Sequence, residues 1–306
     1  MNITSSTTDK SVSAVLFCYN EVEYIQKTIR SIQNQSIAVE NIIIVDDFST
    51  DGTVKVIKQL ASTDGRIQCI QNKYKKGKVG AYQTGLERVR TEYFFVIGAD
   101  DEANPNLVKE SLEYIEKNET SFVFNSAEMI DENSCPLNRQ FISSFDAATC
   151  FYYNKTGGLI FARSKIIEEI IPFPSQLEFE DWYTVLTLFQ RFGRVETSVQ
   201  PLIKYRIHSR SDSQASRWDW HRRRSLLERD IRFLKLMRQR EATNESAREE
   251  LSRSIRFRER LIRGLPSLGK DIRMSMILLK SYLSLSLSRI ISRLAQLRIK
   301  AENTRH

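Results

Sequence analysis

Residues 93–101 read Tyr-Phe-Phe-Val-Ile-Gly-Ala-Asp-Asp, an apolar run that ends in two adjacent carboxylates. Five consecutive apolar residues predict a strand covered on both faces, because a half-buried strand would alternate polar and apolar residues. Asp100 and Asp101 would then lie at the carboxyl end of that strand, where open α/β sheets bind ligands and where paired acids suit a divalent metal. A solvated Asp-Asp turn explains this stretch equally well.

The residues before this stretch alternate between strand patterns and helix patterns. Short runs rich in β-branched residues predict strands at 12–19, 41–45 and 66–71. Apolar residues at helical spacing predict helices at 24–35, 54–60 and 81–90. This alternation predicts an α/β fold with a mostly parallel sheet, wound by right-handed crossovers and flanked by helices.

The alternation becomes less regular after residue 105. We expect a helix to about 117, strands at 121–125, 159–162 and 199–207, and helices through 170 and at 180–192. Long Arg-rich helical patterns follow at 218–263 and 271–300. The chain is therefore expected to divide into a disordered segment at 1–11, an α/β domain at 12–214 and a basic helical extension at 215–306.

The composition indicates an intracellular protein. The four cysteines of the 306-residue chain are far apart and form no CxxC pair, which predicts neither a zinc site nor a disulfide framework. Reduced thiols are typical of the cytoplasm. The polar residues 1–11 lack the apolar core of a signal peptide, so we expect a cytoplasmic location.

The net charge of +8 is unevenly distributed. Residues 215–306 contain 23 basic and 10 acidic residues, a net of +13, which leaves −5 for the rest. Such asymmetry predicts an anionic partner for the extension, either membrane lipid or nucleic acid, and a solvated helical face is the alternative. No nucleic-acid recognition motif is present, and charge alone gives only nonspecific binding.

The stretch 271–300 combines apolar residues at helical spacing with Lys and Arg side chains. A basic amphipathic helix of this kind can lie in a membrane interface, and packing on the body of the protein or on a partner helix is an equal alternative. No uncharged stretch of 18 residues is present, so a spanning helix is not expected. Whether the long helices also form a homo-oligomer stays open.

Polar clusters follow several of the predicted strands, and winding of the chain brings such strand ends together. Taken alone, each has an ordinary explanation: acids at a helix start cap the helix, Asp-Ser-Gly segments form turns, and most histidines lie on the surface or in the core. The clusters are Asn20-Glu21, Asp46-Asp47, Asp100-Asp101, His208 with its neighbouring serines, and Glu180-Asp181 at a helix start.

The order and spacing of these clusters resemble the family 2 glycosyltransferases, whose nucleotide-sugar-binding fold is called GT-A. The resemblance covers residues 12–213 and is most specific at 45–53, Val-Asp-Asp-Phe-Ser-Thr-Asp-Gly-Thr. Residues 18–21 resemble the first-strand motif of the family, 97–101 its metal-binding acidic motif, 179–182 the acidic pair that contains the catalytic base, and 205–208 a closing motif.

The resemblance implies a role for each matching residue. Asp181 would be the general base, and Asp100 would bind Mg²⁺ or Mn²⁺ with His208 as a second ligand or a diphosphate contact. Lys78, in a Lys- and Gly-rich loop, would contact the diphosphate, although a solvated loop is equally common. The implied donor-binding residues are Tyr19, Glu21, Asp46, Asp47, Lys78, Asp100, Glu180 and Trp182.

This sequence departs from the family pattern at two places inside the resemblance. Gly98 stands where the acidic motif usually begins with an Asp, so a ribose or metal contact would be missing. Tyr82 stands where the helix after the loop usually has a basic residue. We interpret the first departure as retuning of the site.

The resemblance implies an inverting, metal-dependent glycosyltransferase. It would move a sugar from a nucleoside-diphosphate sugar to a hydroxyl of a saccharide or lipid-linked acceptor, building a surface polysaccharide or glycolipid. The basic extension adds the expectation of peripheral association with the inner face of the cell membrane. The alternative is a catalytically inactive GT-A module that binds a membrane or protein partner through its basic helices.

Overall fold

The computed structural model describes residues 10–147, 149–152, 154–209, 220–240 and 245–264. The chain forms two compact units, residues 1–215 and 216–306, and each is described by itself. The predicted amphipathic helix at 271–300 and residues 1–9 lie outside the described residues. Ser11, placed in the segment expected to be disordered, is held in the structure, since its carbonyl and hydroxyl oxygens accept hydrogen bonds from the backbone N–H groups of Tyr93 and Glu92.

The first half of unit 1 is a parallel sheet in the order β3-β2-β1-β4. Its apolar strands place Ala14 of β1 between Ile42 of β2 and Phe95 of β4. The predicted α/β fold is confirmed, and the predicted strands agree with the observed ones to within one residue. They are β1 (Val12–Cys18), β2 (Asn41–Asp46), β3 (Ile67–Gln71) and β4 (Tyr93–Gly98).

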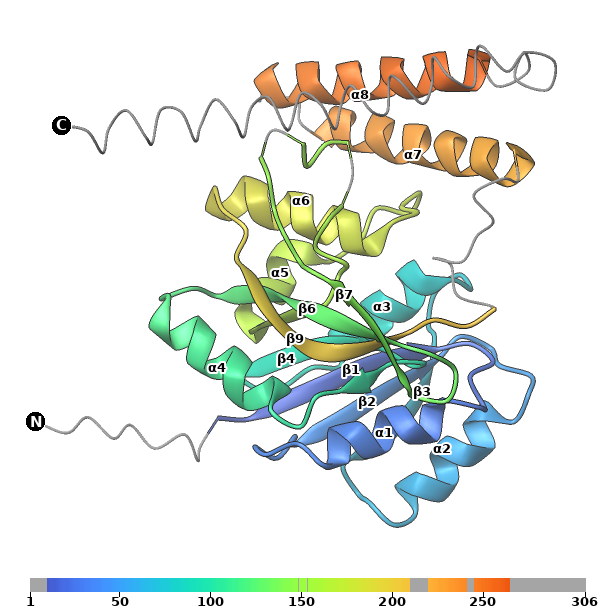
Figure 1. Cartoon of the computed structure of the whole chain (residues 1–306), viewed down its shortest axis with the longest axis vertical. Coiled ribbons are helices and arrows are strands. Elements are labelled where there is room, and N and C mark those ends of the chain that lie inside the picture. Colours follow the sequence, from blue (N-terminus) through green and yellow to red (C-terminus); the bar gives the residue numbers. More distant parts are fainter. Residues whose placement is uncertain (1–9, 148, 153, 210–219, 241–244, 265–306) are drawn as a thin grey trace, which may run out of the picture. The chain divides into compact units, whose positions relative to one another are not determined.

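Helices cover both faces of this sheet (Figure 1). Helices α1 (Ile25–Gln33), α2 (Thr53–Ala61) and α4 (Leu107–Lys117) share one apolar core with Ala14 and Leu16 of β1. Helix α3 (Lys78–Leu86) packs on the opposite face, where a Cβ at Gly85 would lie 2.5 Å from Val15 Cγ1. Gly85 therefore permits the close approach of α3 to the strands.

The second half of the sheet is mixed, where the sequence indicated only less regular alternation. Strand β8 is antiparallel to both β4 and β6, and β9 is parallel to β6. The sequence analysis did not predict β5, which has two residues, or β7, whose residues are mostly exposed. These strands are β5 (Glu102–Ala103), β6 (Phe122–Ile130), β7 (Pro136–Phe141), β8 (Ile160–Arg163) and β9 (Thr197–Arg206).

These directions define one functional edge of the sheet. The carboxyl ends of β1, β2, β4, β6 and β9 lie there, together with the amino end of the antiparallel strand β8. A 3₁₀ turn (Ser164–Ile166) and α5 (Ile167–Ile170) follow β8. Helix α6 (Glu180–Phe192) then ends at Gly193, which adopts a left-handed φ of 71°.

Unit 2 contains α7 (Trp220–Arg240) and α8 (Glu245–Gly264), which pack on each other. The Arg-rich pattern predicted over 218–263 is thus two helices in the described residues. Leu234 and Leu251 are fully buried, and Arg258 Nε lies 2.9 Å from Asp230 Oδ2. No helix among the described residues is both long and apolar enough to span a membrane.

Candidate active site

The structure brings Asp100 and His208 together from opposite halves of the fold. Asp100 follows β4 and His208 follows β9, and His208 Nε2 lies 3.1 Å from Asp100 Oδ2. The Asp100 side chain keeps 28% of its surface exposed, whereas that of His208 keeps 4%. The carboxylate is therefore open to a ligand while the imidazole supports it from inside the protein.

Asp101 points into the protein and holds the acidic loop against β9. It is 2% exposed, and its Oδ1 accepts a hydrogen bond of 2.8 Å from the backbone N–H of Arg206. Burial, followed by the neighbouring charge of Asp100, raises the pKa of Asp101 well above its ordinary value. Asp101 is therefore held inside the protein while Asp100 is partly exposed, and the metal contact expected of Asp100 stays a prediction.

Gly98 lies directly under both carboxylates. A Cβ at this position would lie 2.7 Å from Asp100 Oδ1 and 2.7 Å from Asp101 Oδ2. Any side chain here would force the two acids to move. The departure from the family pattern therefore has a physical reason, since the Asp100 and Asp101 side chains fill the space that a residue at 98 would need.

Arg206 connects the acidic loop to the last strand of the sheet. Its side chain is fully buried, and its Nε donates a 2.7 Å hydrogen bond to the backbone carbonyl of Asp100. Its terminal nitrogens contact Glu102, Ser134 and the carbonyls of the turn between β6 and β7. In the sequence, Arg206 lies within the motif at 205–208, and its charge near the end of a predicted strand was the signal that could have identified it.

Asp46 and Asp47 are both buried and hold neighbouring loops. The Asp46 carboxylate accepts hydrogen bonds from the backbone N–H of Ser49. Asp47 Oδ2 accepts a 2.8 Å bond from the Gly77 N–H, and its Oδ1 accepts a 2.7 Å bond from Asn72 Nδ2. Asp47 thus fixes the Lys-rich loop against the end of β2, and the predicted nucleoside contact of either acid stays a prediction.

Tyr19 and the Lys-rich loop face each other at the same edge. The Tyr19 side chain is 45% exposed, and Lys76 Nζ lies 3.8 Å from the centre of its ring. Lys78 is exposed in the first turn of α3. Glu21 follows β1, and its N–H donates to Thr53 Oγ1 at the start of α2. These residues place an aromatic face and lysine ammonium groups beside the carboxyl ends of β1 and β2.

Asp181 lies in the first turn of α6 and is held by two donors. Asn154 Nδ2 donates a 3.0 Å bond to Asp181 Oδ2, and the Trp182 N–H donates to Asp181 Oδ1 at 2.7 Å. Gly158, whose φ is 71°, lets the chain pass so close that a Cβ there would lie 2.8 Å from Asp181 Cβ. Because Gly158 precedes β8, Asp181 lies at the same edge as Asp100. Nothing in the sequence distinguished Asn154.

The residues that flank Asp181 are directed into the protein. Glu180 is 9% exposed, and Trp182 is buried, with its indole N–H donating a 2.8 Å bond to the Cys150 carbonyl. Burial, followed by the charges of Glu180 and Asp181, raises the pKa of Tyr82. Tyr82 therefore packs beside the start of α6 as a buried neutral ring, at the position where the family usually has a basic residue.

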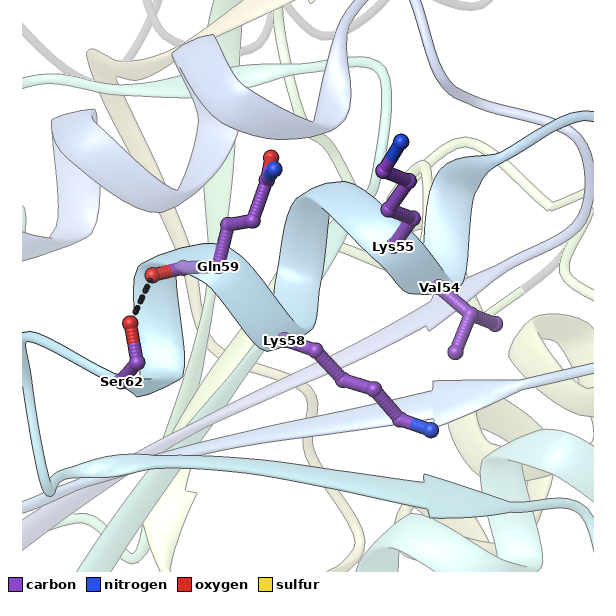
Figure 2. Close-up of a pocket in the computed structure, with 5 residues that line it drawn as sticks. All are labelled: Val54, Lys55, Lys58, Gln59 and Ser62. Atoms are coloured by element: carbon purple, nitrogen blue, oxygen red, sulfur yellow. Dashed lines mark hydrogen bonds between the residues drawn. The ribbon is translucent and has the colours of Figure 1, made fainter.

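A depression of about 530 Å³ lies along α2 (Figure 2). Its lining residues belong to α2 and the residue after it, and Ser62 Oγ bonds the Gln59 carbonyl at 2.7 Å. The lining contains no carboxylate, and it lies apart from the residues predicted to act in catalysis. The lining residues are Val54, Lys55, Lys58, Gln59 and Ser62.

The donor set at Asp100 and His208 fits a metal that shares its coordination with a substrate. The described residues contain no group of three His, Cys, Asp or Glu side chains able to hold a metal alone. Mg²⁺ and similar ions are commonly bound by one or two protein ligands plus phosphate oxygens and water. Asp100 and His208 match that pattern, and they do not match a closed structural site.

Comparison with known proteins identifies a family for the first half of the chain. Residues 13–164 match the family described as "Glycosyl transferase family 2". This part of the chain belongs to glycosyltransferase family 2. The match contains Asp46, Asp47, Asp100 and Asn154, whereas Asp181, Arg206 and His208 lie beyond it.

Three relatives extend the comparison. An uncharacterized glycosyltransferase of Haemophilus influenzae is 28% identical over 66% of this chain and 67% of its own length. The putative teichuronic acid biosynthesis glycosyltransferase TuaG of Bacillus subtilis is 30% identical over 42% of this chain and 51% of its own. The Escherichia coli UDP-Glc:α-D-GlcNAc-diphosphoundecaprenol β-1,3-glucosyltransferase WfgD is 30% identical over 48% and 55%. The chain thus spans about half the length of the latter two glycosyltransferases.

Solved structures confirm the GT-A fold of this family 2 member. The S. aureus TarS structure in complex with UDP-GlcNAc superposes with a TM-score of 0.56 at 13% identity, covering 73% of this chain and 66% of that one. The TarS structure in complex with UDP gives the same TM-score over 85% and 91%. At this identity the likeness establishes the fold alone.

Proposed function

We propose that the protein is an inverting, metal-dependent glycosyltransferase. It would transfer a sugar from a nucleoside-diphosphate sugar to a hydroxyl of a saccharide or lipid-linked acceptor, in the synthesis of a surface polysaccharide or glycolipid. The observation that carries the proposal is the contact of 3.1 Å between Asp100 and His208 at the sheet edge that also carries Asp181. The names of TuaG and WfgD, which refer to teichuronic acid and to a diphosphoundecaprenol-linked sugar, support this class of product and acceptor.

Asp181 is proposed as the general base. Its carboxylate would accept the proton of the acceptor hydroxyl as that oxygen attacks the anomeric carbon, while the bond to the nucleoside diphosphate breaks on the opposite side. A single displacement of this kind inverts the anomeric configuration. The hydrogen bonds from Asn154 and from the Trp182 N–H support the role, because they hold the carboxylate in one orientation.

Asp100 and His208 would hold Mn²⁺ or Mg²⁺. When bound, the metal would neutralise negative charge on the departing diphosphate. Lys78, and Lys76 above the Tyr19 ring, would add positive charge next to the same phosphates. The nucleoside is proposed to lie against Tyr19 and near Glu21, Asp46 and Asp47, beside the ends of β1 and β2.

A donor-panel assay that measures release of nucleoside diphosphate tests the enzyme proposal. We expect release from at least one nucleotide sugar in the presence of Mn²⁺, and its loss on chelation with EDTA. Asp181→Asn should lower the rate by about 100-fold or more, because a positioned general base contributes about that much. The matched control is Glu168→Gln, which changes an exposed side chain of α5 and should leave the rate unchanged.

The same assay separates the alternative function. If no sugar nucleotide is turned over with Mn²⁺, and Asp181→Asn changes nothing, the chain would be an inactive GT-A module that binds partners.

For location, we propose peripheral association with the inner face of the membrane. Helices α7 and α8 support this, since together they carry 14 Lys and Arg against six Asp and Glu residues.

A further inference from the structure

We propose that Arg206 is a positioning residue that sets the separation of Asp100 and His208. The inference rests on the proposed function, because it concerns how this chain places the two residues proposed to hold the metal. Arg206 touches neither a substrate nor the reacting atoms. Its role is to join the loop that carries Asp100 to the strand that carries His208.

The first argument is the complete burial of a charged side chain. Arg206 is 0% exposed, and burying a guanidinium is costly unless each donor finds an acceptor. Its Nε donates to the Asp100 carbonyl at 2.7 Å, and one terminal nitrogen contacts Glu102 Oε1 at 2.5 Å. The other donates to the Asp131 carbonyl at 2.9 Å and to Ser134 Oγ at 3.1 Å. Arg206 therefore occupies a site built for it.

The second argument is that Arg206 holds the acidic loop at two points. Its backbone N–H bonds Asp101 Oδ1 at 2.8 Å, and its Nε bonds the Asp100 carbonyl. Strand β5, which begins at Glu102, also pairs with β9 through Lys204. The loop can thus move relative to β9 only if these bonds break. Since His208 follows β9, the same bonds fix the place of Asp100 relative to His208.

The third argument is the shared neighbour of Arg206 and His208. Arg206 is the last residue of β9, and His208 follows two positions later. The Tyr24 ring contacts both: the Arg206 guanidinium carbon lies 4.9 Å from its centre, and the His208 ring centre lies 5.0 Å away. Tyr24 therefore supports the guanidinium and the imidazole together.

The shape of the arginine side chain is required for this role. A guanidinium presents five donors in a fixed planar fork, and here the fork reaches Asp100, Glu102 and the turn that contains Ser134 at once. A lysine keeps the charge but has one nitrogen on a flexible stem, so it can satisfy only part of these acceptors. Arg206→Lys therefore keeps the positive charge and removes part of the hydrogen bonds that position the acidic loop.

The test is direct measurement of Mn²⁺ binding to the full chain, by electron paramagnetic resonance of free Mn²⁺, with UDP as the diphosphate probe. We expect Arg206→Lys to weaken Mn²⁺ binding about 10- to 100-fold, as outer-shell changes at metal sites do. Thermal melting, measured in parallel, shows that each variant is folded at the assay temperature. The control is Arg66→Lys, which alters a partly exposed Arg–Asp ion pair just before β3 and should leave Mn²⁺ binding unchanged.

A second variant covers the case in which Arg206→Lys does not fold. Ser134→Ala removes the hydroxyl that donates to Glu102 and accepts from Arg206, and it should weaken Mn²⁺ binding about two- to fivefold, the worth of one hydrogen bond. Unchanged Mn²⁺ affinity in folded Arg206→Lys, or in Ser134→Ala, would overturn the positioning role. Failure of the unaltered chain to bind Mn²⁺ with UDP would instead contradict the proposed metal dependence, and with it this inference.

Discussion

At the residue scale, Gly98 is where a missing side chain shapes the site. The Asp100 and Asp101 carboxylates occupy the space above it, each 2.7 Å from the position of an added Cβ. A close contact of this kind with buried Asp101 cannot be relieved by a simple rotation into solvent. The geometry of the acidic loop therefore depends on glycine at this position.

We expect Gly98→Ala to lower the rate of nucleoside diphosphate release about tenfold, because it would displace Asp100, the proposed metal ligand. Gly98→Asp should lower the rate further, since it also adds a third carboxylate to the loop. The rate of nucleoside diphosphate release at several Mn²⁺ concentrations measures both effects. Gly65→Ala is the matched control, because nothing lies within 4 Å of a Cβ at that position. An increase in donor affinity in Gly98→Asp would show that the family's usual carboxylate can be restored.

Asn154 is expected to affect the chemical step more than donor binding. Its side-chain N–H bonds Asp181, and its carbonyl oxygen is fixed by the N–H and hydroxyl of Thr156. Asn154→Ala should lower kcat about tenfold and leave the donor KM nearly constant, because the carboxylate loses its orientation. Asn118→Ala, which removes an exposed bond at the end of α4, should change neither constant. A rise in donor KM with constant kcat would assign Asn154 to binding.

The residues proposed to act directly could be predicted from the sequence, whereas the roles of the residues that position them could not. Asp100 follows a predicted strand and Asp181 lies in a motif that resembles the family's acidic pair, so both could be named from the sequence. Arg206 and Asn154 act through contacts with residues 106 and 27 positions away. Such contacts depend on the mixed half of the sheet, whose order β8-β6-β9 no local pattern encodes.

At the element scale, the Asp47 carboxylate anchors the Lys-rich loop before α3 to the end of β2. Asp47 bonds the Gly77 N–H and the Asn72 side chain, and Gly77 has a φ of 135°, which a residue with a side chain rarely adopts. Asp47→Ala should therefore release the loop and make trypsin cleave faster after Lys73 to Lys78. Asp51→Ala, which removes a cap at the start of α2, is the control and should leave that cleavage slow. Equal protection in both variants would contradict the anchoring role of Asp47.

The turn into β3 gives a prediction of pH dependence. Hydrogen bonds from Arg66, and one from Gln33, hold the pKa of Asp64 below its ordinary value of 3.8. A depressed pKa stabilises the fold above 3.8, and this contribution is lost as the pH falls through the lower folded value. Asp64→Asn should thus unfold at lower denaturant concentration than the parent at pH 7, with a constant difference down to about pH 4 and a shrinking one below. A difference that grows towards acid pH would contradict this assignment.

The elements themselves show why the first half of the fold was easier to predict. Apolar β1, β2 and β4 are buried on both faces and separated by amphipathic helices, so each has a local pattern. Strand β7 is mostly exposed, and β5 pairs over only two residues with β9. Both strands form because of partners distant in sequence, which a reading of local periodicity does not detect.

At the scale of the whole molecule, we expect membrane binding to depend on unit 2 alone. Unit 1 has its own apolar core, and the helices α7 and α8 of unit 2 carry 14 Lys and Arg against six Asp and Glu residues. We expect a chain ending at residue 215 to lose flotation with anionic liposomes, because the attraction of the Lys and Arg side chains is removed. Neutral liposomes are the control for both chains. Unchanged flotation of the shortened chain would contradict membrane binding through this unit.

The four thiols differ in exposure, so a thiol-reactive dye should label one of them selectively. Cys18 and Cys150 are buried, and burial raises the pKa of Cys150 to about 12, while the pKa of half-buried Cys69 is also raised. Cys135 is exposed and follows the turn whose carbonyls and Ser134 hydroxyl bind Arg206. A maleimide dye at pH 7 should therefore attach first at Cys135. Such a dye would sit at the far end of the network that reaches Asp100, where its fluorescence could report on the acidic loop without any change to the loop itself.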